Sequence, residues 1–288
     1  MRQLFGTDGI RGVAGQYPLD KKTVYAVGLA LGHHLPAGPR RLVIGQDTRE
    51  SSAWIAETLA AGLHDSGAET ESAGVITTPG IAYLTHTHGF SAGVVISASH
   101  NPWQDNGIKI FGRDGYKLPD EIELEIETEI FSRLESASGE GLPSKPSLPG
   151  TVTLRDDYTQ WLARLVTSTG NLRLVVDCAN GAACTVAPEV FRLRGMAADF
   201  LHCSPNGRNI NENCGALHPE AVAREVVARK ADLGICFDGD ADRALFADGQ
   251  GNIVNGDAVM LLLARDLKQQ GRLVNNTVVA TTMSNMGL

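Results

Sequence analysis

Short apolar runs alternate with helical patterns along most of the chain. Three strand-like runs are each followed by a helical pattern: 42–45 before 53–63, 93–96 before 121–134, and 172–177 before 182–193. This alternation is typical of α/β domains, because a parallel strand needs a crossover, usually a helix, before its neighbour. The pattern therefore predicts tandem α/β domains with mixed, largely parallel sheets.

A stretch rich in Ser, Gly and Pro, from Ser136 to Gly150, interrupts the alternation and is the best candidate for a linker. We place the first domain at 1–150 and the second at 151–253.

The remaining residues, 254–288, read as the start of a third domain. Gly256 and Asp257 precede an apolar helical pattern at 258–267, and the run Val-Val-Ala-Thr-Thr at 278–282 resembles a strand. Only six residues follow that run, so we expect a chain truncated within its third domain.

Composition indicates an ordinary folded enzyme rather than a tail or a fibre. The chain has 288 residues, of which 43% are hydrophobic and 20% charged, which is enough for about two domains with real cores. A net charge of −8 argues against general nucleic-acid binding, which needs a basic face. No secretory h-region opens the chain, and the longest apolar stretch, 258–264, is too short to span a bilayer, so we expect a cytoplasmic protein without membrane contact.

Cysteine usage favours thiols over cross-links. The five cysteines are odd in number and show no Cys-x-x-Cys spacing. We therefore expect buried free thiols rather than disulfides or a zinc site.

Three aspartates at alternate positions directly follow an apolar run. The run at 233–237 predicts a buried strand; Asp238, Asp240 and Asp242 come next, and Arg243 closes the segment. Carboxylate oxygens are the ligands that a hard divalent cation prefers. In a straight strand, side chains on one face recur about every 6.6 Å, so the outer carboxylates would be too far apart to share an ion. We therefore predict that the segment curls at the small residues between the aspartates.

Two alternatives compete with a divalent-cation site here. A calcium-binding EF-hand loop requires Gly at its sixth position and Glu at its twelfth, where this chain has Arg243 and Gly249. A solvated acidic turn is the other alternative, and three carboxylates closed by an arginine after a buried strand argue against it.

A second polar segment follows the apolar run at 93–96. Residues 97–102 (Ser-Ala-Ser-His-Asn-Pro) read as a small-residue loop at the end of a strand. Open α/β sheets place reactive groups at such ends, so Ser99 is a candidate nucleophile, with an ordinary structural loop as the alternative. Residues 106–111 read as a turn and an alternating strand that would return Lys109 toward this loop. Lys109 would there act as a general acid or base, or as the counter-charge of a phosphate; the base role requires a lowered pKa.

Together, the segments 5–12 (Phe-Gly-Thr-Asp-Gly-Ile-Arg-Gly), 97–102 and 238–243 resemble the α-D-phosphohexomutases. The segments 209–211 (Asn-Ile-Asn) and 283–288 (Met-Ser-Asn-Met-Gly-Leu) are similar to the bacterial subgroup that acts on glucosamine phosphates.

The resemblance implies a site built around Ser99 and a magnesium ion. Ser99 would carry a phosphoryl group and would bind Mg²⁺ together with Asp238, Asp240 and Asp242. A phosphoserine carries about −1.5 to −2 charge, so three carboxylates beside it require a divalent cation between them.

Four further residues receive roles from the same resemblance. Arg243 and Arg11 would bind phosphate, Lys109 would transfer a proton, and Arg11 and His100 would support catalysis by electrostatics and positioning. As alternatives, Arg243 would pair with its neighbouring aspartates, Arg11 would bind backbone carbonyls, and His100 would be a hydrogen-bonded loop residue.

The implied reaction is an intramolecular phosphoryl transfer. It would interconvert glucosamine 6-phosphate and glucosamine 1-phosphate through a 1,6-bisphosphate, for cell-wall amino-sugar synthesis. The partner would be a phosphorylated hexosamine, and a homodimer is compatible with the resemblance. A mutase of glucose or mannose phosphates is one alternative, and a non-catalytic module that binds metal or phosphosugar is another.

Family members carry a sugar-reading loop of the Glu-x-Ser-Gly-His type in a third domain and a phosphate-binding loop of the Arg-Ser-Gly-Thr type in a fourth. Neither motif occurs in these 288 residues. We therefore expect this polypeptide to bind Mg²⁺ but to turn over no substrate by itself.

Overall fold

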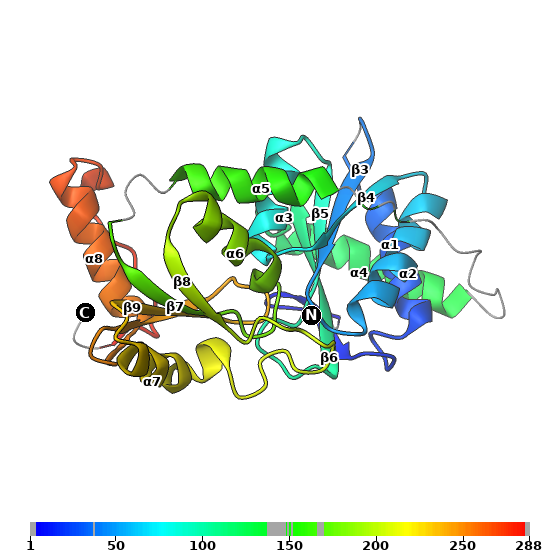
Figure 1. Ribbon diagram of the computed structural model, residues 1–288. Coiled ribbons are helices and arrows are strands. Elements are labelled where there is room, and N and C mark those ends of the chain that lie inside the picture. Colours follow the sequence, from blue (N-terminus) through cyan, green and yellow to red (C-terminus); the bar gives the residue numbers. More distant parts are fainter. Residues whose placement is uncertain are drawn as a thin grey trace.

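Two α/β units lie side by side in the structure, each built on its own mixed sheet (Figure 1). The computed structural model describes residues 4–36, 38–136, 148, 150, 152–165 and 170–285. The expected α/β fold with mixed sheets is therefore confirmed.

The first sheet has a parallel centre with an antiparallel extension. Its order is β1-β2-β6-β5-β3-β4, in which β5, β3 and β4 run parallel and β1, β2 and β6 are added antiparallel. In chain order the strands are β1 Phe5–Gly6, β2 Gly9–Val13, β3 Arg41–Gln46, β4 Glu69–Val75, β5 Ala92–Ile96 and β6 Asp105–Gly112.

Helices cover both faces of this sheet, and the alternation of side chains along β3 shows why. Leu42 and Ile44 face a core that is closed by α1 (Lys21–His33), α2 (Ser52–Asp65) and α4 (Asp120–Ser136). Val43 faces the opposite core, beneath α3 (Thr78–Thr87). A central strand buried on both faces must be apolar throughout, which explains the unbroken run at 42–44.

The second sheet repeats this plan with order β11-β10-β9-β7-β8. Its strands are β7 Arg173–Asp177, β8 Ala197–Leu201, β9 Leu233–Phe237, β10 Ala244–Asp248 and β11 Ile253–Val254. The helices α6 (Ala183–Leu193) and α7 (Pro219–Arg229) cover opposite faces, and the short helix η1 (Gly215–Leu217) precedes α7.

Helix α5 (Val152–Leu165) belongs by its packing to both units. Its Leu154 and Tyr158 are buried in the core beneath α3, and Val186 of α6 is buried in the same core. Figure 1 shows α5 lying across α3 and α6. The predicted division at residue 150 stays a prediction, since most of the proposed linker lies outside the described residues.

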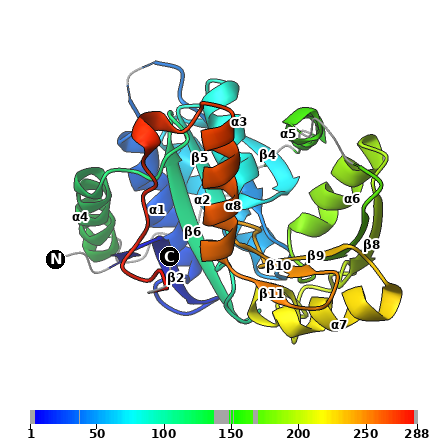
Figure 2. The ribbon, with the colours of Figure 1, turned by 90° about the vertical axis from the view of Figure 1, so that its left-hand side faces the viewer.

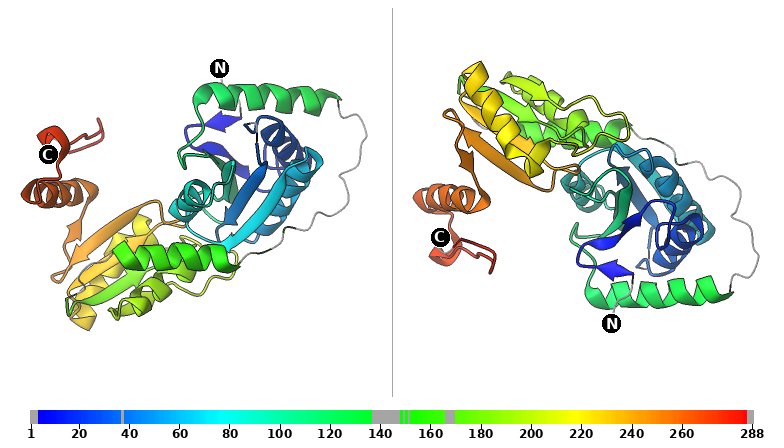
Figure 3. Two further views of the ribbon diagram at one scale, coloured as in Figure 1. Left: turned by 90° about the horizontal axis from the view of Figure 1, so that it is seen from above. Right: turned by 90° about the horizontal axis from the view of Figure 1, so that it is seen from below.

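Beyond residue 254 the chain leaves the second unit. Helix α8 (Gly256–Gln269) begins at Asn255, whose side chain accepts from the amide of Ala258, and none of its residues is buried. Figure 3 shows α8 and the following segment, including η2 (Val274–Asn276), standing off the edge of the second unit, and in Figure 2 α8 lies toward the viewer, in front of the two units. The helix predicted at 258–267 is confirmed.

Two local predictions were wrong. The run 278–282 forms no strand, and within the described residues no strand pairs with it, so its backbone has no ladder to join. Asn106 and Gly107 form no turn but lie inside β6, opposite Gly12 and Arg11 of β2. Among the described helices, none is long and apolar enough to cross a membrane.

Burial predicts a contrast between two leucines in helix interiors. Leu84 of α3 is fully buried and Leu262 of α8 is 60% exposed. We expect Leu84→Ala to lower the free energy of unfolding by about 2–5 kcal/mol, because it removes buried methyl groups and leaves a cavity. The matched Leu262→Ala should change it by less than about 0.5 kcal/mol. Urea denaturation followed by circular dichroism measures both, and equal effects would contradict the packing described here.

Candidate active site

The three aspartates after β9 curl into a cluster, as predicted. One oxygen from each of Asp238, Asp240 and Asp242 lies within 4.8 Å of the other two. The left-handed residue in the curl is Ala241, at φ 54°, rather than the glycine. Gly239 instead allows the two backbones to approach closely, because a Cβ at this position would lie 2.5 Å from the carbonyl oxygen of Ser99.

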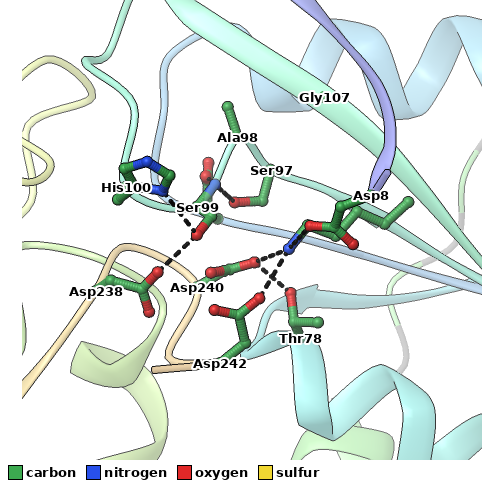
Figure 4. Close-up of polar contacts among 12 residues, drawn as sticks. Asp8, Thr78, Ser97, Ala98, Ser99, His100, Gly107, Asp238, Asp240 and Asp242 are labelled. Atoms are coloured by element: carbon green, nitrogen blue, oxygen red, sulfur yellow. Dashed lines mark hydrogen bonds and ion pairs between the residues drawn. The ribbon is translucent and has the colours of Figure 1, made fainter. Parts of the chain in front are cut away.

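Ser99 meets this cluster from the end of β5 in the other unit. Its Oγ donates to Asp238 Oδ2 at 2.6 Å and accepts from Arg243 Nη2 at 2.7 Å. Figure 4 shows the hydroxyl pointing toward Asp238. The serine is only 1% exposed, and its φ of 54° is left-handed, which is uncommon for a residue with a side chain.

Two side chains hold the backbone of this serine turn. Arg49 Nη2 donates to the carbonyl oxygens of Ser99 at 3.2 Å and Asn101 at 2.6 Å. Asn211, from the second unit, donates its Nδ2 to the same oxygens at 2.9 and 3.2 Å. The left-handed turn is therefore fixed from both units at once.

A buried ion pair beneath the turn orients Arg49. Asp47 accepts from Arg49 Nη1 at 2.7 Å, and the hydroxyls of Ser52 and Ser97 donate to the same carboxylate at 2.8 and 2.7 Å. Both charged side chains of the pair are fully buried. This ion pair was not predicted from the sequence. The available signal was the position of Asp47, which directly follows β3, the strand next to β5 in the sheet.

Lys109 lies among the carboxylates. Its Nζ is 2.8 Å from Asp240 Oδ2, 3.0 Å from Asp242 Oδ2 and 3.0 Å from Asp8 Oδ2. Burial alone would lower the pKa of Lys109, but the carboxylates raise it above its ordinary value. The lowered pKa that a general base requires is therefore not found, and the side chain is an ammonium.

The carboxylate of Asp240 is fully buried and incompletely satisfied. Its Oδ2 accepts from the hydroxyl of Thr78 at 2.6 Å as well as from Lys109, whereas no donor in the described chain reaches Oδ1. Burial, together with the repulsion from Asp240 and Asp242, raises the pKa of Asp238 to about 6. An orphaned oxygen and crowded carboxylates fit a hard divalent cation such as Mg²⁺.

The three remaining predicted residues lie around this centre. Arg243 contacts Ser99, pairs with Asp238 at 3.2 Å and donates to Nδ1 of His100. Burial and the neighbouring guanidinium of Arg243 lower the pKa of His100, so the ring is a neutral hydrogen-bond acceptor.

Arg11 pairs with Asp8 at 2.8 Å and approaches the carbonyl oxygen of Ala98 at 3.5 Å. The second contact is of the kind that the sequence analysis gave as the alternative to phosphate binding.

Comparison with known proteins identifies the class to which this fold and site belong. Residues 2–137 match the family model of phosphoglucomutase/phosphomannomutase α/β/α domain I, and residues 156–251 match that of domain II. The chain belongs to the phosphoglucomutase/phosphomannomutase family, as the resemblance to phosphohexomutases implied.

The most similar sequences include two bacterial phosphoglucosamine mutases. That of Koribacter versatilis is 61% identical and that of Solibacter usitatus 54% identical over the whole chain, which spans 64% of the length of each. A solved phosphoglucomutase/phosphomannomutase family protein from Burkholderia thailandensis is 27% identical with a TM-score of 0.78, over 93% of this chain and 59% of that one.

The buried ion pair generates a stability prediction. We expect Arg49→Met to lower the free energy of unfolding by about 3–5 kcal/mol, because it leaves the carboxylate of Asp47 buried without its cation. Arg192→Met, in an exposed pair with Glu189, should have no measurable effect. Denaturant titration of both variants provides the comparison, and a tolerated Arg49→Met would show that the pair does not hold the serine turn.

Proposed function

We propose that the protein carrying this chain is a phosphoglucosamine mutase that interconverts glucosamine 6-phosphate and glucosamine 1-phosphate. One observation carries the proposal: the hydroxyl of Ser99 lies between a carboxylate cluster and the guanidinium of Arg243. This arrangement suits a serine that carries a phosphoryl group. The choice of glucosamine rests on the names of the similar bacterial proteins.

The reaction follows from a phosphoserine at Ser99. In the first step the Oγ–P bond breaks, the phosphoryl group bonds to O1 of glucosamine 6-phosphate, and the proton of the O1 hydroxyl passes to Oγ of Ser99. In the second step, after the 1,6-bisphosphate has turned around, its O6–P bond breaks, the phosphoryl group returns to Oγ of Ser99, and the serine proton passes to O6. Such transfers need in-line positioning and charge neutralisation more than covalent help from the protein.

Asp238, Asp240 and Asp242 are the proposed protein ligands of Mg²⁺, with the phosphate on Ser99 as a fourth. When bound, the ion neutralises the charge that a phosphoserine and three carboxylates accumulate together. Asp240 keeps one oxygen free of hydrogen bonds in the described chain, and Thr78 orients the other.

The basic side chains around Ser99 have different proposed roles. Arg243 donates to Oγ of Ser99, where it would bind an oxygen of the phosphoryl group. We assign Lys109 to charge balance and to donating a proton, because its contacts favour the ammonium form. Arg11 and His100 support the site from its rim, and the neutral His100 helps to orient Arg243.

We infer that these 288 residues bind Mg²⁺ and hold the phosphoserine but turn over no substrate by themselves, because the sugar-reading and second phosphate-binding motifs do not occur in them. A cytoplasmic location and a homodimer complete the proposal.

Phosphorylation of Ser99 is the first test. After treatment with Mg²⁺ and glucosamine 1,6-bisphosphate, we expect intact-mass measurement to show one added phosphoryl group and peptide mapping to place it on Ser99. Ser99→Ala should abolish the addition, and Ser204→Ala, at an exposed loop serine, should retain it. A phosphoryl group on another residue, or none, would contradict the proposed nucleophile and favour a binding module.

The raised pKa of Asp238 generates a pH prediction. Since the metal-free carboxylate holds its proton up to about pH 6, Mg²⁺ must displace that proton at lower pH. We expect Mg²⁺ affinity to fall about tenfold per pH unit below this value and to level off above it. Isothermal titration calorimetry from about pH 5 to about pH 7.5 measures the slope. Asp238→Asn should bind more weakly and lose the slope; an affinity independent of pH in the unsubstituted chain would refute the assignment.

The raised pKa of Asp238 also affects the stability of the metal-free fold. The folded-state pKa of Asp238 lies above its ordinary value, so this carboxyl stabilises the metal-free fold at low pH, and that contribution is lost as pH rises through about 6.

A further inference from the structure

Three cysteines from separate elements converge in the second unit, away from the aspartate cluster. Cys178 directly follows β7, Cys184 lies in the first turn of α6, and Cys203 follows β8. Their sulfur atoms all lie within 4.8 Å of one another. The three cysteines show no Cys-x-x-Cys spacing, so their convergence could not be predicted from the sequence.

The three thiols are free and make only weak hydrogen bonds. None of them forms a disulfide. Weak thiol contacts run from Cys184 to the carbonyl oxygen of His202 at 3.5 Å and from Cys203 to that of Cys184 at 3.7 Å. Cys178 is buried, whereas Cys184 and Cys203 are partly exposed, so the cluster is closed to solvent at Cys178 and open to solvent at the other two residues.

We propose that Cys178, Cys184 and Cys203 form a binding site for a thiophilic divalent cation of the Zn²⁺ class. Zn–S bonds measure about 2.3 Å, so sulfurs around one tetrahedral ion lie about 3.8 Å apart, and the observed separations of at most 4.8 Å exceed this value by no more than about 1 Å. Three thiols and one cation give a trithiolate complex with one net negative charge and release three protons. The exposed side leaves a fourth position for water.

A neighbouring cluster shows by contrast what distinguishes this one. Asp177, His202 and Cys214 also bring ligand atoms within 4.8 Å of one another. However, the carboxylate of Asp177 already accepts from the ring of His202 and from two backbone amides, those of Ala179 and Gly215. That group is a satisfied hydrogen-bond network with a buried carboxylate, whereas in the described chain the three sulfurs have only weak thiol contacts with one another and with two backbone carbonyl oxygens.

The two cation sites would differ in their preferred ion and are connected by one loop. Oxygen ligands at Asp238–Asp242 favour Mg²⁺, whereas thiolates favour zinc-like ions. The loop between Cys178 and Cys184 touches the aspartate segment, since the amide of Ala182 donates to the carbonyl oxygen of Gly239 at 2.8 Å. Occupation of the thiol site would thus restrain the backbone beside the magnesium ligands.

Titration of the reduced chain with Co²⁺ and Cd²⁺, in the presence of excess Mg²⁺, tests the proposal. We expect one equivalent of either ion to produce thiolate-to-metal charge-transfer absorption. Cys184→Ser and Cys203→Ser should each weaken binding at least tenfold. Cys236→Ala removes a buried thiol of β9 outside the cluster and should leave the absorption unchanged.

A second measurement needs no substitution. Zn²⁺ should protect Cys184 and Cys203 of the unsubstituted chain from alkylation by iodoacetamide, as mapped by mass spectrometry, and a chelator should remove the protection. No charge-transfer band at one equivalent, a band that survives Cys184→Ser, or unprotected Cys184 and Cys203 in the presence of Zn²⁺ would each overturn the proposal.

Discussion

The mutual repulsion of four carboxylates is the constraint on which the candidate site depends. They belong to Asp8, Asp238, Asp240 and Asp242, and they meet where the two units touch. Lys109 offsets three of them and Arg243 lies against the fourth. Burial, together with the repulsion from Asp240 and Asp242, still raises the pKa of Asp238. A phosphoryl group on Ser99 would add negative charge, so a divalent cation and a phosphoserine are each more favourable in the presence of the other.

This constraint also explains why the site is divided between two units. Ser99, Lys109 and Asp8 come from the first unit and the three aspartates after β9 come from the second, so neither unit holds the full charge by itself. Thr78 donates both its amide and its hydroxyl to Asp240 across the contact. The core shared by α3, α5 and α6 stabilises this arrangement with apolar burial, which offsets the cost of bringing like charges together.

The sequence predicted the parts of the site that local patterns encode. Strand ends after 93–96 and 233–237 located Ser99 and the aspartates, because a change from apolar to small polar residues marks where a strand leaves the sheet. It missed Asp47, Arg49 and Asn211, whose roles depend on contacts between distant segments. The direction of the Lys109 pKa shift was hidden for the same reason, since Asp8 and the aspartate segment reach it only in the folded chain.

The backbone of Ser99 shows how these distant contacts determine the chemistry. A left-handed conformation of a residue with a side chain costs about 1–3 kcal/mol and persists only where the surroundings impose it. Arg49 and Asn211 impose it by binding the Ser99 carbonyl oxygen, and Gly239 allows the opposing backbone to approach that oxygen. The backbone that carries the hydroxyl is thus fixed by groups that do not touch the hydroxyl, and Asp238 and Arg243 contact its oxygen directly. Phosphorylation would change the charge of this side chain on a backbone that is already positioned, so little of the energy of the transfer is needed to orient the serine.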